Sequence, residues 1–437
     1  MSIMKDSRLE WIEQIPETWT TNKMKYLFDF GKGLSITKEN LIENGLPVIS
    51  YGQIHSKNNS GVEIDKDLLR FVSFDYKKNN PSAEVKQYDF VFADTSEDYE
   101  GCGNCVYKRD SDVLYGGYHV VIAHSKKKDD KRYFAYLFKT DCWRMQLREK
   151  VSGVKVFSIT QKAISNTSVI VPPQDEQIRI ADFLDAKCKE IDFLITDIYK
   201  EIEILESYKK SVITEVVVGG LNKSVRKKES GIEWAPTIPE HWSVKKGKYI
   251  FSLRNQKGNK ICLQLLSPTQ KFGVIPQSMY EELTGMGAVK LKEDTNYETL
   301  KTIHKGDFCI SLRSFQGGFE YSEYEGVVSP AYQVFYPMLK IADGYFKYMF
   351  KERGFIEKMN SYTLSLRDGK NIAFSDFGNS YLPIPPYEEQ VNIANFLDKT
   401  KFEIDQIINE KHKQISTLEE YKKSVIYEYV TGKKSVN

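Results

Sequence analysis

An internal duplication constrains this 437-residue chain more than any other feature of its sequence. Residues 6–28 (DSRLEWIEQIPETWTTNKMKYLF) recur 223 positions later, at 229–251 (ESGIEWAPTIPEHWSVKKGKYIF). Residues 172–213 recur 213 positions later, at 385–426, and the ending ESYKKSVI returns as EEYKKSVI. Such self-similarity indicates one structural unit that is built twice.

The stretches between the repeated blocks differ from each other. Residues 29–171 and 252–384 show little resemblance, and the second stretch is ten residues shorter. A common frame therefore surrounds two diverged inserts. The tail VTGKK at 430–434 resembles the residues that follow the first long block. The C-terminus thus ends where a further copy of the N-terminus would begin, as in a cyclic arrangement cut open once.

The repeated blocks at 172–213 and 385–426 each predict a long helix with a coiled-coil seam. Apolar residues recur every seven positions, as a coiled coil requires. Each helix runs for about 43 residues, or roughly 65 Å at about 1.5 Å per residue. A Pro-Pro pair, acidic residues in the first turn and a glycine (Gly219, Gly432) mark the ends. The seam residues are Leu184, Cys188, Ile191, Ile195, Ile198, Ile202, Leu205, Lys209, Val212 and Val216, then Leu397, Ile404, Ile408, Lys411, Ile415, Leu418 and Val425.

A lone helix of this length must bury its seam against another helix. One alternative is a homodimeric coiled coil. We favour packing of the two copies on each other within the chain, in antiparallel orientation. Each globular segment lies at the N-terminal end of its helix, so an antiparallel pair separates the two segments, whereas a parallel pair would crowd them together.

The globular segments predict a mixed α/β fold. Asp89-Phe90 and Asp307-Phe308 each precede an apolar run at the same relative place, so the two segments should share a fold. Strands are predicted at 46–54, 88–94, 118–124 and 167–173, then at 306–314, 332–337 and 379–386. Helices are predicted at 131–150 and 345–360.

Several catalytic signatures are nearly present and fail. Ile384-Pro-Pro-Tyr387 resembles an amino-methyltransferase motif, but Ile384 cannot accept a hydrogen bond from an amine, so a strand-to-helix junction is the better interpretation. Cys102 and Cys105 form a single CxxC without the second ligand pair that zinc requires, so free thiols are expected. We find no phosphate-binding loop, GxSxG or HExxH motif.

Charge and targeting signals add modest limits. The net charge of +2 and the pI near 8.0 permit DNA binding without arguing for it. The charged N-terminus is unlike a signal peptide, and no apolar run is long enough to span a bilayer. The 6 dispersed cysteines suit reduced thiols, so a cytoplasmic location is expected.

The EW…IPE.W opening blocks, the diverged inserts and the PP..EQ..I..FLD…YKKSVI helices resemble the specificity subunit of type I restriction-modification systems. The resemblance covers nearly the whole chain. It implies a non-catalytic, sequence-specific DNA-binding subunit. Its implied parts are a target recognition domain at 1–171, a spacer helix at 172–219, a second recognition domain at 220–384, a second spacer helix at 385–432, and a tail at 433–437.

The same resemblance implies what the parts do. Each recognition domain would read one half of a split double-stranded DNA site. The helices would set the gap between the halves and dock two methyltransferase subunits, with two motor-nuclease subunits as optional further partners. No cofactor is expected in this chain, because S-adenosylmethionine, ATP and Mg would belong to the partner subunits.

Base-reading residues can only be nominated from side-chain chemistry. Arg and Lys suit guanine, and Asn and Gln suit adenine. Polar clusters in the diverged segments supply the candidates, although a solvated loop is the alternative for each. They are Tyr51, Gln53, His55, Lys57, Asn58, Asn59, Lys155 and Ser158 in the first segment, and Arg254, Asn255, Gln256, Lys257, Asn259, Lys260, Arg313, Ser314, Gln316, Arg367 and Lys370 in the second.

Two other functions remain open at this point. One is a stand-alone DNA methyltransferase or nuclease, against which the missing motifs weigh. The other is a coiled-coil scaffold without a role in DNA recognition.

Overall fold

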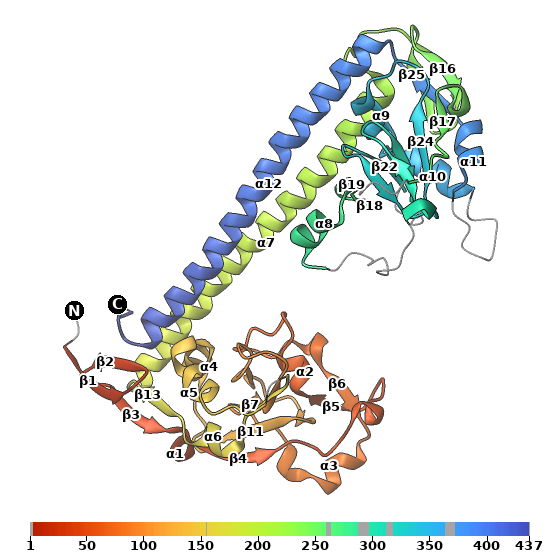
Figure 1. The fold of residues 1–437 in the computed structure, drawn as a ribbon. Helices are drawn as coiled ribbons and strands as arrows, with labels where there is room; N and C mark the ends of the chain where they lie inside the picture. Colours follow the sequence, from red (N-terminus) through yellow and green to blue (C-terminus); the bar gives the residue numbers. More distant parts are fainter. Residues whose placement is uncertain are drawn as a thin grey trace. The chain divides into compact units, whose positions relative to one another are not determined.

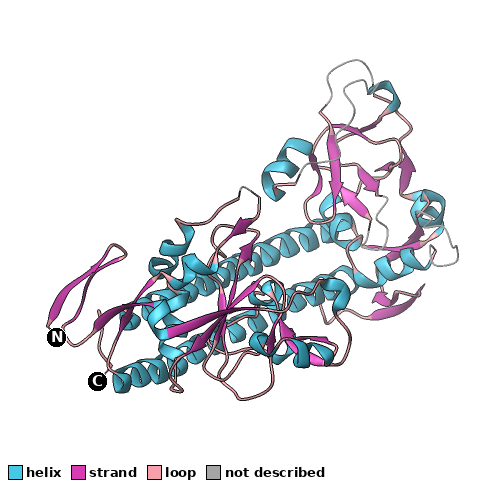
Figure 2. Cartoon of the chain, turned by 90° about the horizontal axis from the view of Figure 1, so that it is seen from below, coloured by secondary structure: helices cyan, strands magenta, loops and turns pink. Residues whose placement is uncertain are grey.

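The computed structural model describes residues 3–153, 155–258, 264–286, 297–311, 318–362 and 372–436. The chain forms two compact units. Unit 1 comprises Met1–Ile198 with Lys413–Asn437, and unit 2 comprises Tyr199–His412. Two long helices, α7 (Gln174–Gly219) and α12 (Tyr387–Val430), contribute residues to both units (Figures 1 and 2). The domain boundaries proposed from the sequence remain predictions.

Each opening block folds as a β-hairpin with a register shift near its turn. The hairpin is followed by a strand that pairs antiparallel with the strand preceding the long helix. The repeated blocks therefore meet in space at the start of each long helix. In unit 1 these strands are β1 (Met4–Leu9), β2 (Ile12–Pro16), β3 (Thr20–Lys23) and β13 (Ser168–Val171); in unit 2 they are β14 (Lys227–Ile232), β15 (Ala235–Pro239), β16 (Ser243–Lys246) and β25 (Tyr381–Ile384).

The diverged inserts share a four-stranded antiparallel sheet with the same connectivity. In unit 1 the order is β4 (Phe28–Lys32), β11 (Val120–Ser125), β7 (Phe90–Ala93), β9 (Cys105–Tyr107). In unit 2 it is β17 (Phe251–Leu253), β24 (Gln333–Pro337), β21 (Phe308–Ile310), β22 (Phe319–Tyr321). The prediction of a shared mixed α/β fold is thus confirmed.

Smaller sheets flank this common sheet and differ between the units. Unit 1 has the sheet β10 (Tyr115–Gly116), β5 (Leu46–Ile49), β6 (Arg70–Val72) and the pair β8 (Thr95–Ser96) with β12 (Phe157–Ser158). Unit 2 has the pairs β18 (Leu266–Thr269) with β19 (Gly273–Pro276), and β20 (Lys301–Ile303) with β23 (Gly326–Val328). The inserts diverge chiefly in these additions.

Three predicted elements are wrong in detail. The strand expected at 46–54 ends at Ile49, and Tyr51–Ile54 form the short helix α2 behind a Ser50 capping box. The helix expected at 131–150 is broken at Thr140, and the one expected at 345–360 is broken around Glu352, because both residues adopt extended backbone and start a second helix. The resulting pairs are α4 (Arg132–Lys139) with α5 (Asp141–Arg148), and α9 (Asp343–Met349) with α10 (Arg353–Ser361).

Within each unit α7 and α12 lie side by side and run in opposite directions. In unit 1 Lys422 Nζ lies 2.5 Å from Asp192 Oδ1, and the rings of Phe183 and Tyr429 lie 4.3 Å apart. In unit 2 Lys209 Nζ lies 2.8 Å from Asp405 Oδ1, and Lys411 pairs with Glu201. The predicted intramolecular antiparallel pairing is confirmed. The seam lysines Lys209 and Lys411 are each neutralised by a carboxylate of the opposite helix.

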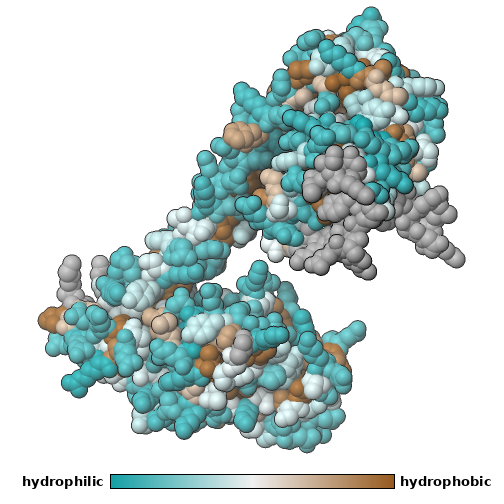
Figure 3. Space-filling model, viewed as in Figure 1, coloured by the Kyte–Doolittle hydropathy of each residue, from teal (hydrophilic) through white to brown (hydrophobic). Residues whose placement is uncertain are grey.

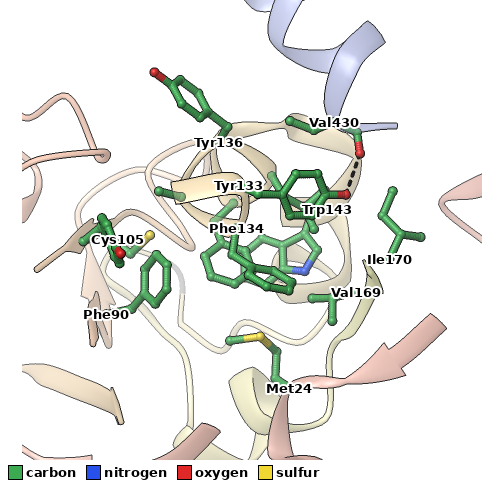
Figure 4. Packing of buried hydrophobic residues seen from close by; sticks show 14 of the residues in the cluster. Met24, Phe90, Cys105, Tyr133, Phe134, Tyr136, Trp143, Val169, Ile170 and Val430 are labelled. Carbon is green, nitrogen blue, oxygen red and sulfur yellow. Dashed lines mark hydrogen bonds between the residues drawn. The ribbon is translucent and has the colours of Figure 1, made fainter. Parts of the chain in front are cut away.

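The C-terminal end of each long helix packs against the opening block of a repeat, as expected from the cyclic arrangement of the repeats in the sequence. In unit 1 Val425, Ile426 and Val430 join the core around Trp19, and Tyr133 Oη donates to the Val430 carbonyl at 2.8 Å (Figure 4). In unit 2 Val212, Val216 and Val217 join the core around Trp242, and Tyr345 Oη donates to the Val217 carbonyl at 3.0 Å. The C-terminal helix thus completes the core of the N-terminal segment.

The repeated Pro-Pro and Glu-Gln residues have a structural role at the strand-to-helix junction. Gln177 donates to the Pro172 carbonyl at 2.8 Å, and Gln390 donates to the Pro385 carbonyl at 2.9 Å. Ile384 ends β25 and Tyr387 begins α12, so the junction interpretation of that motif is confirmed. Among the described residues, no helix has both the length and the apolar composition to cross a membrane.

Candidate nucleic-acid interface

Tyr51 stands at the centre of an aromatic group in unit 1. It begins α2, and its ring centroid lies 5.5 Å from that of His119, 5.6 Å from Tyr118 and 6.3 Å from His55, each in an edge-to-face arrangement. Edge-to-face packing holds such rings at defined angles. The group therefore offers a fixed set of ring edges and polar nitrogen atoms.

Some of the neighbouring candidates already make hydrogen bonds within the protein, whereas others have exposed side chains. His55 is committed, because its Nε2 lies 2.8 Å from the Thr95 carbonyl and its Nδ1 lies 3.0 Å from Asn104 Nδ2. Gln53 caps its own helix, since its Oε1 accepts from the Ser50 amide, and Asn59 donates to the Ile54 carbonyl. Lys57 and Asn58 are exposed in the following turn.

A pocket of about 700 Å³ opens beside the aromatic group. Ser158, a sequence candidate, lines it from β12, and Lys32, Gln161 and Lys162 line it as well. These last three were missed by sequence reasoning. None of the three adjoins a predicted strand, so the sequence offered only their hydrogen-bonding chemistry, which DNA recognition uses.

His119 also lines this pocket and has a left-handed backbone, with φ of 56°. Such a conformation is uncommon for a residue other than glycine, and strained residues of this kind gather at functional sites. Its Nδ1 lies 3.3 Å from Asp94 Oδ1 and 3.3 Å from Thr95 Oγ1, and its side chain is 57% exposed. Lys155, also exposed, precedes β12 by two residues.

Arg254 of unit 2 is occupied inside its own segment. Its Nε lies 2.6 Å from Asp307 Oδ2 and its Nη2 lies 2.9 Å from Asp307 Oδ1, while Asp307 is only 2% exposed. The guanidinium also lies 4.5 Å from the centre of the Tyr336 ring. Asn255, Gln256 and Lys257 follow as exposed residues.

The other candidates of the second segment lie outside the residues that the structure describes. These are Asn259, Lys260, Arg313, Ser314, Gln316, Arg367 and Lys370. The list of DNA-contacting residues therefore remains a prediction in both segments.

The cysteines of the CxxC pair lie in the core of unit 1. Both thiols are free and buried. Burial raises the pKa of Cys105 to about 12 and raises the pKa of Cys102 as well, so both stay protonated near neutral pH. Among the described residues, no group of three or more His, Cys, Asp or Glu side chains is placed to hold a metal ion.

The surface seen in Figure 3 is mainly hydrophilic over each globular segment, with hydrophobic residues in separate small patches. The long helices do carry large apolar side chains outside the seam. Phe193 is 63% exposed, Ile204 67% and Phe402 63%.

The sequence profile of the type I restriction modification DNA specificity domain matches the chain twice, at residues 16–204 and 239–420. The chain belongs to this family. Both matches take in part of a globular segment and of the long helix that follows it, so the family's domain is the repeated unit itself. Specificity subunits of type I systems are non-catalytic, as the resemblance implied.

Two curated specificity subunits resemble the chain over nearly its full length. It is 24% identical to the putative type I restriction enzyme MjaX specificity subunit of Methanocaldococcus jannaschii, over 97% of this chain and 95% of that protein. It is 20% identical to the StySPI specificity subunit of Salmonella potsdam, over 96% and 90% of the respective chains.

Two solved structures share the fold of this specificity subunit. One comes from work on complex assembly and conformational transition of the type I R-M system, with a TM-score of 0.68 and 14% identity over 96% of this chain and 99% of that chain. The other is the HsdS subunit from Thermoanaerobacter tengcongensis, with a TM-score of 0.54 and 15% identity over 96% and 98%.

Proposed function

We propose that each globular segment of this specificity subunit recognises one half of a bipartite double-stranded DNA site. The observation that carries the proposal is the repeated frame with unequal inserts. The strand order, helix junction and helix closure recur in both units, whereas the flanking sheets and polar loops do not. Two globular segments built on the same repeated structure can therefore recognise different DNA sequences.

In the first segment the proposed reading surface contains Tyr51, Lys57 and Asn58, together with Ser158 and His119 at the pocket. Exposed Lys57 and Asn58 have the donors and acceptors that suit guanine and adenine edges. Phosphate contacts would come from nearby lysines such as Lys32 and Lys162, since phosphate contacts dominate the affinity of DNA binding. Arg254 is not part of the proposed surface, because its guanidinium is bound to Asp307.

The long helices would set the unread gap between the half-sites and dock two methyltransferase subunits. Their continuity over 46 and 44 residues and their exposed apolar side chains support both roles. A rigid link raises the effective concentration of the second reader once the first has bound. Two motor-nuclease subunits are optional further partners. S-adenosylmethionine, ATP and Mg would act on the partner subunits, in the cytoplasm.

Methylation mapping tests this function. Co-expression with a methyltransferase subunit of the same type I system should yield modified adenines in one bipartite motif, and omission of this chain should abolish the pattern. Replacement of residues 29–171 by another recognition segment should change one half of the motif only. An unsplit motif, or a change in both halves, would contradict the proposal.

Point variants refine the test in the first segment. The double substitution K57A/N58A should reduce methylation at sites with the original half-site by about tenfold, since a good base contact contributes about 1–3 kcal/mol. K128A removes an exposed lysine elsewhere in unit 1 and is the matched control. Methylation by purified chain alone would instead support the stand-alone enzyme.

A further inference from the structure

Unit 2 contains a pocket of about 400 Å³ that the proposed DNA-reading role does not use. The hairpin β18–β19 and helix α8 (Gln277–Thr284) line one side. Strand β22, helix α9 and residues of α7 and α12 line the other side. Its volume falls within the range of small-molecule sites, about 300–1,000 Å³.

The wall of this pocket holds a buried carboxylate with an unused oxygen. Glu320 is 2% exposed, and its Oε1 accepts from Lys351 Nζ at 2.7 Å. Its Oε2 is buried and has no hydrogen-bond partner among the described residues. Burial raises the pKa of Glu320. A buried acceptor left unpaired is costly, so each such group in a native fold calls for an explanation.

The sheet itself does not require this carboxylate. Glu320 lies opposite Cys309 in unit 2, and Val106 lies opposite Val91 at the equivalent place in unit 1. Valine is therefore compatible with the same strand pairing. Within unit 1 the equivalent of Lys351, which is Lys139, donates to the Ser60 carbonyl at 2.6 Å. Glu320 is thus a feature of the pocket rather than of the common frame.

Lysines supply an excess of positive charge around the pocket. Lys209 and Lys347 are paired, with Asp405 at 2.8 Å and with Glu323 at 3.1 Å. Lys271 and Lys401 also line the pocket, and neither has a carboxylate partner in the described part of the chain. Two unpaired ammonium groups favour a ligand that carries negative charge.

The remaining lining is aromatic and apolar. Phe272, Tyr321 and Tyr324 contribute rings, while Met279 and Leu283 of α8 are 37% and 50% exposed. Apolar surface at a concave site is covered favourably by a planar ring. The pocket therefore combines a ring-sized apolar wall, one buried acceptor and unpaired cations.

We propose that this pocket binds a small aromatic anion with an amino donor, of which an adenine nucleotide is the simplest case. The amino group would donate to Glu320 Oε2, the ring would lie against Phe272 and Tyr321, and the phosphate would face Lys271 and Lys401. This inference does not rest on the proposed reading of DNA by either segment.

Calorimetry on the full chain tests the proposal with adenosine 5′-monophosphate as the probe. Inosine 5′-monophosphate, with a carbonyl in place of the amino group, should bind about tenfold more weakly, because it cannot donate to Glu320 at that position. Adenosine, without phosphate, should also bind about tenfold more weakly. Equal affinities for the two monophosphates, or no binding of adenosine 5′-monophosphate at millimolar concentration, would overturn the proposal.

Variants separate the pocket from nonspecific binding to lysines. E320V installs the residue found at the equivalent place in unit 1 and should abolish the preference for the amino-bearing nucleotide. The double substitution K271A/K401A removes the two lining lysines that lack a carboxylate partner among the described residues. It should weaken adenosine 5′-monophosphate binding about tenfold and leave adenosine binding unchanged. K305A removes an exposed lysine of the same unit outside the pocket and should change nothing. An equal loss in K305A would contradict the proposal even if E320V failed to fold.

Discussion

In unit 1 the carboxylate that precedes the third strand of the common sheet, Asp89, accepts from His124 at 2.7 Å and from the amides of Lys86 and Ser125. In unit 2 its counterpart, Asp307, accepts twice from Arg254 and once from the His304 amide. Both carboxylates are 2% exposed. The sheet thus fixes a buried acid at one place but leaves the identity and origin of its side-chain partner free.

The contacts that hold the C-terminal end of each long helix against the globular segment are, in contrast, the same in both units. Tyr133 and Tyr345 donate to equivalent carbonyls, Tyr136 and Tyr348 donate to Asp185 and Asp398 at 2.7 Å each, and each opening tryptophan meets the first tyrosine edge-on. The residues that make these contacts are identical in the two units, although the four tyrosines lie in the diverged segments. Closure of the long helices therefore uses the same contacts in both units, whereas the interior of each insert is built differently around one buried acid.

The largest expected loss of stability follows from removing the Arg254 guanidinium, which pairs with Asp307 in unit 2. R254A leaves Asp307 buried with one amide donor, so we expect local stability in unit 2 to fall by about 3–4 kcal/mol. H124A leaves Asp89 with two amide donors and should cost unit 1 about 1 kcal/mol. Hydrogen exchange read by mass spectrometry separates the two units, for which a single unfolding midpoint is poorly defined.

R353A is the matched control for that comparison, because Arg353 pairs with Glu357 at the surface of unit 2 and is 86% exposed. It should leave exchange in β21 and β24 unchanged. If R254A also left these strands unchanged while H124A exposed β7, the assignment of Arg254 to the interior rather than to DNA would be wrong.

The next effect compares the two glycines that end the helix closures. Gly220 and Gly432 have φ of 73° and 71°. A Cβ on Gly432 would lie 2.4 Å from Cδ of the Pro16 ring, whereas one on Gly220 would lie 2.8 Å from Oε1 of Glu389, a side chain whose Oε2 accepts from Trp242 Nε1 at 3.0 Å. G220A should cost about 1–2 kcal/mol, mainly from backbone strain, because a carboxylate oxygen can shift further than a proline ring. G432A should cost about 2–3 kcal/mol, because it adds overpacking to the same strain.

Exchange in the last turns of α7 and α12 measures this difference. The expected result is faster exchange at the end of α12 in G432A than at the end of α7 in G220A. Equal protection in both variants would show that the C-terminal closure in unit 1 is looser than the structure indicates. G231A, at a glycine with positive φ but open space around it, controls for strain alone.

Loss of the tyrosine hydrogen bond to the end of a long helix should lower stability by a smaller amount, and equally in both units. Y133F and Y345F each remove one hydroxyl that donates to a helix carbonyl, and each should cost about 1 kcal/mol. Burial raises the pKa of both hydroxyls well above the ordinary value, so both donate at every pH below about 10 and the cost should not vary with pH there. A loss in only one unit would break the equivalence of the closures.

The sequence predicted local elements better than the pairing of distant residues, because a local element is specified by a pattern within one segment. Helix seams, Pro-Pro starts and alternating strands are patterns within one segment, so 88–94, 118–124 and the two long helices were found. The role of Arg254 was not, because its partner Asp307 lies 53 positions away and pairs only once the sheet forms. The breaks at Thr140 and Glu352 were missed because an apolar helical pattern continues across both.

The smallest expected effect concerns the charge pairs between the long helices. Lys209–Asp405 in unit 2 and Lys422–Asp192 in unit 1 are the same pair in the two copies of the repeat, each partly exposed. Double-mutant cycles with alanine should give couplings of about 0.3–1 kcal/mol in each unit, falling with added salt. K423A, which removes a surface lysine paired along its own helix with Glu420, should show no coupling to Asp192. A coupling energy in only one unit would mean that the pair stabilises the two helices there, whereas the equivalent lysine of the other unit is merely tolerated. The two halves of the helix pair would then differ, as the inserts do.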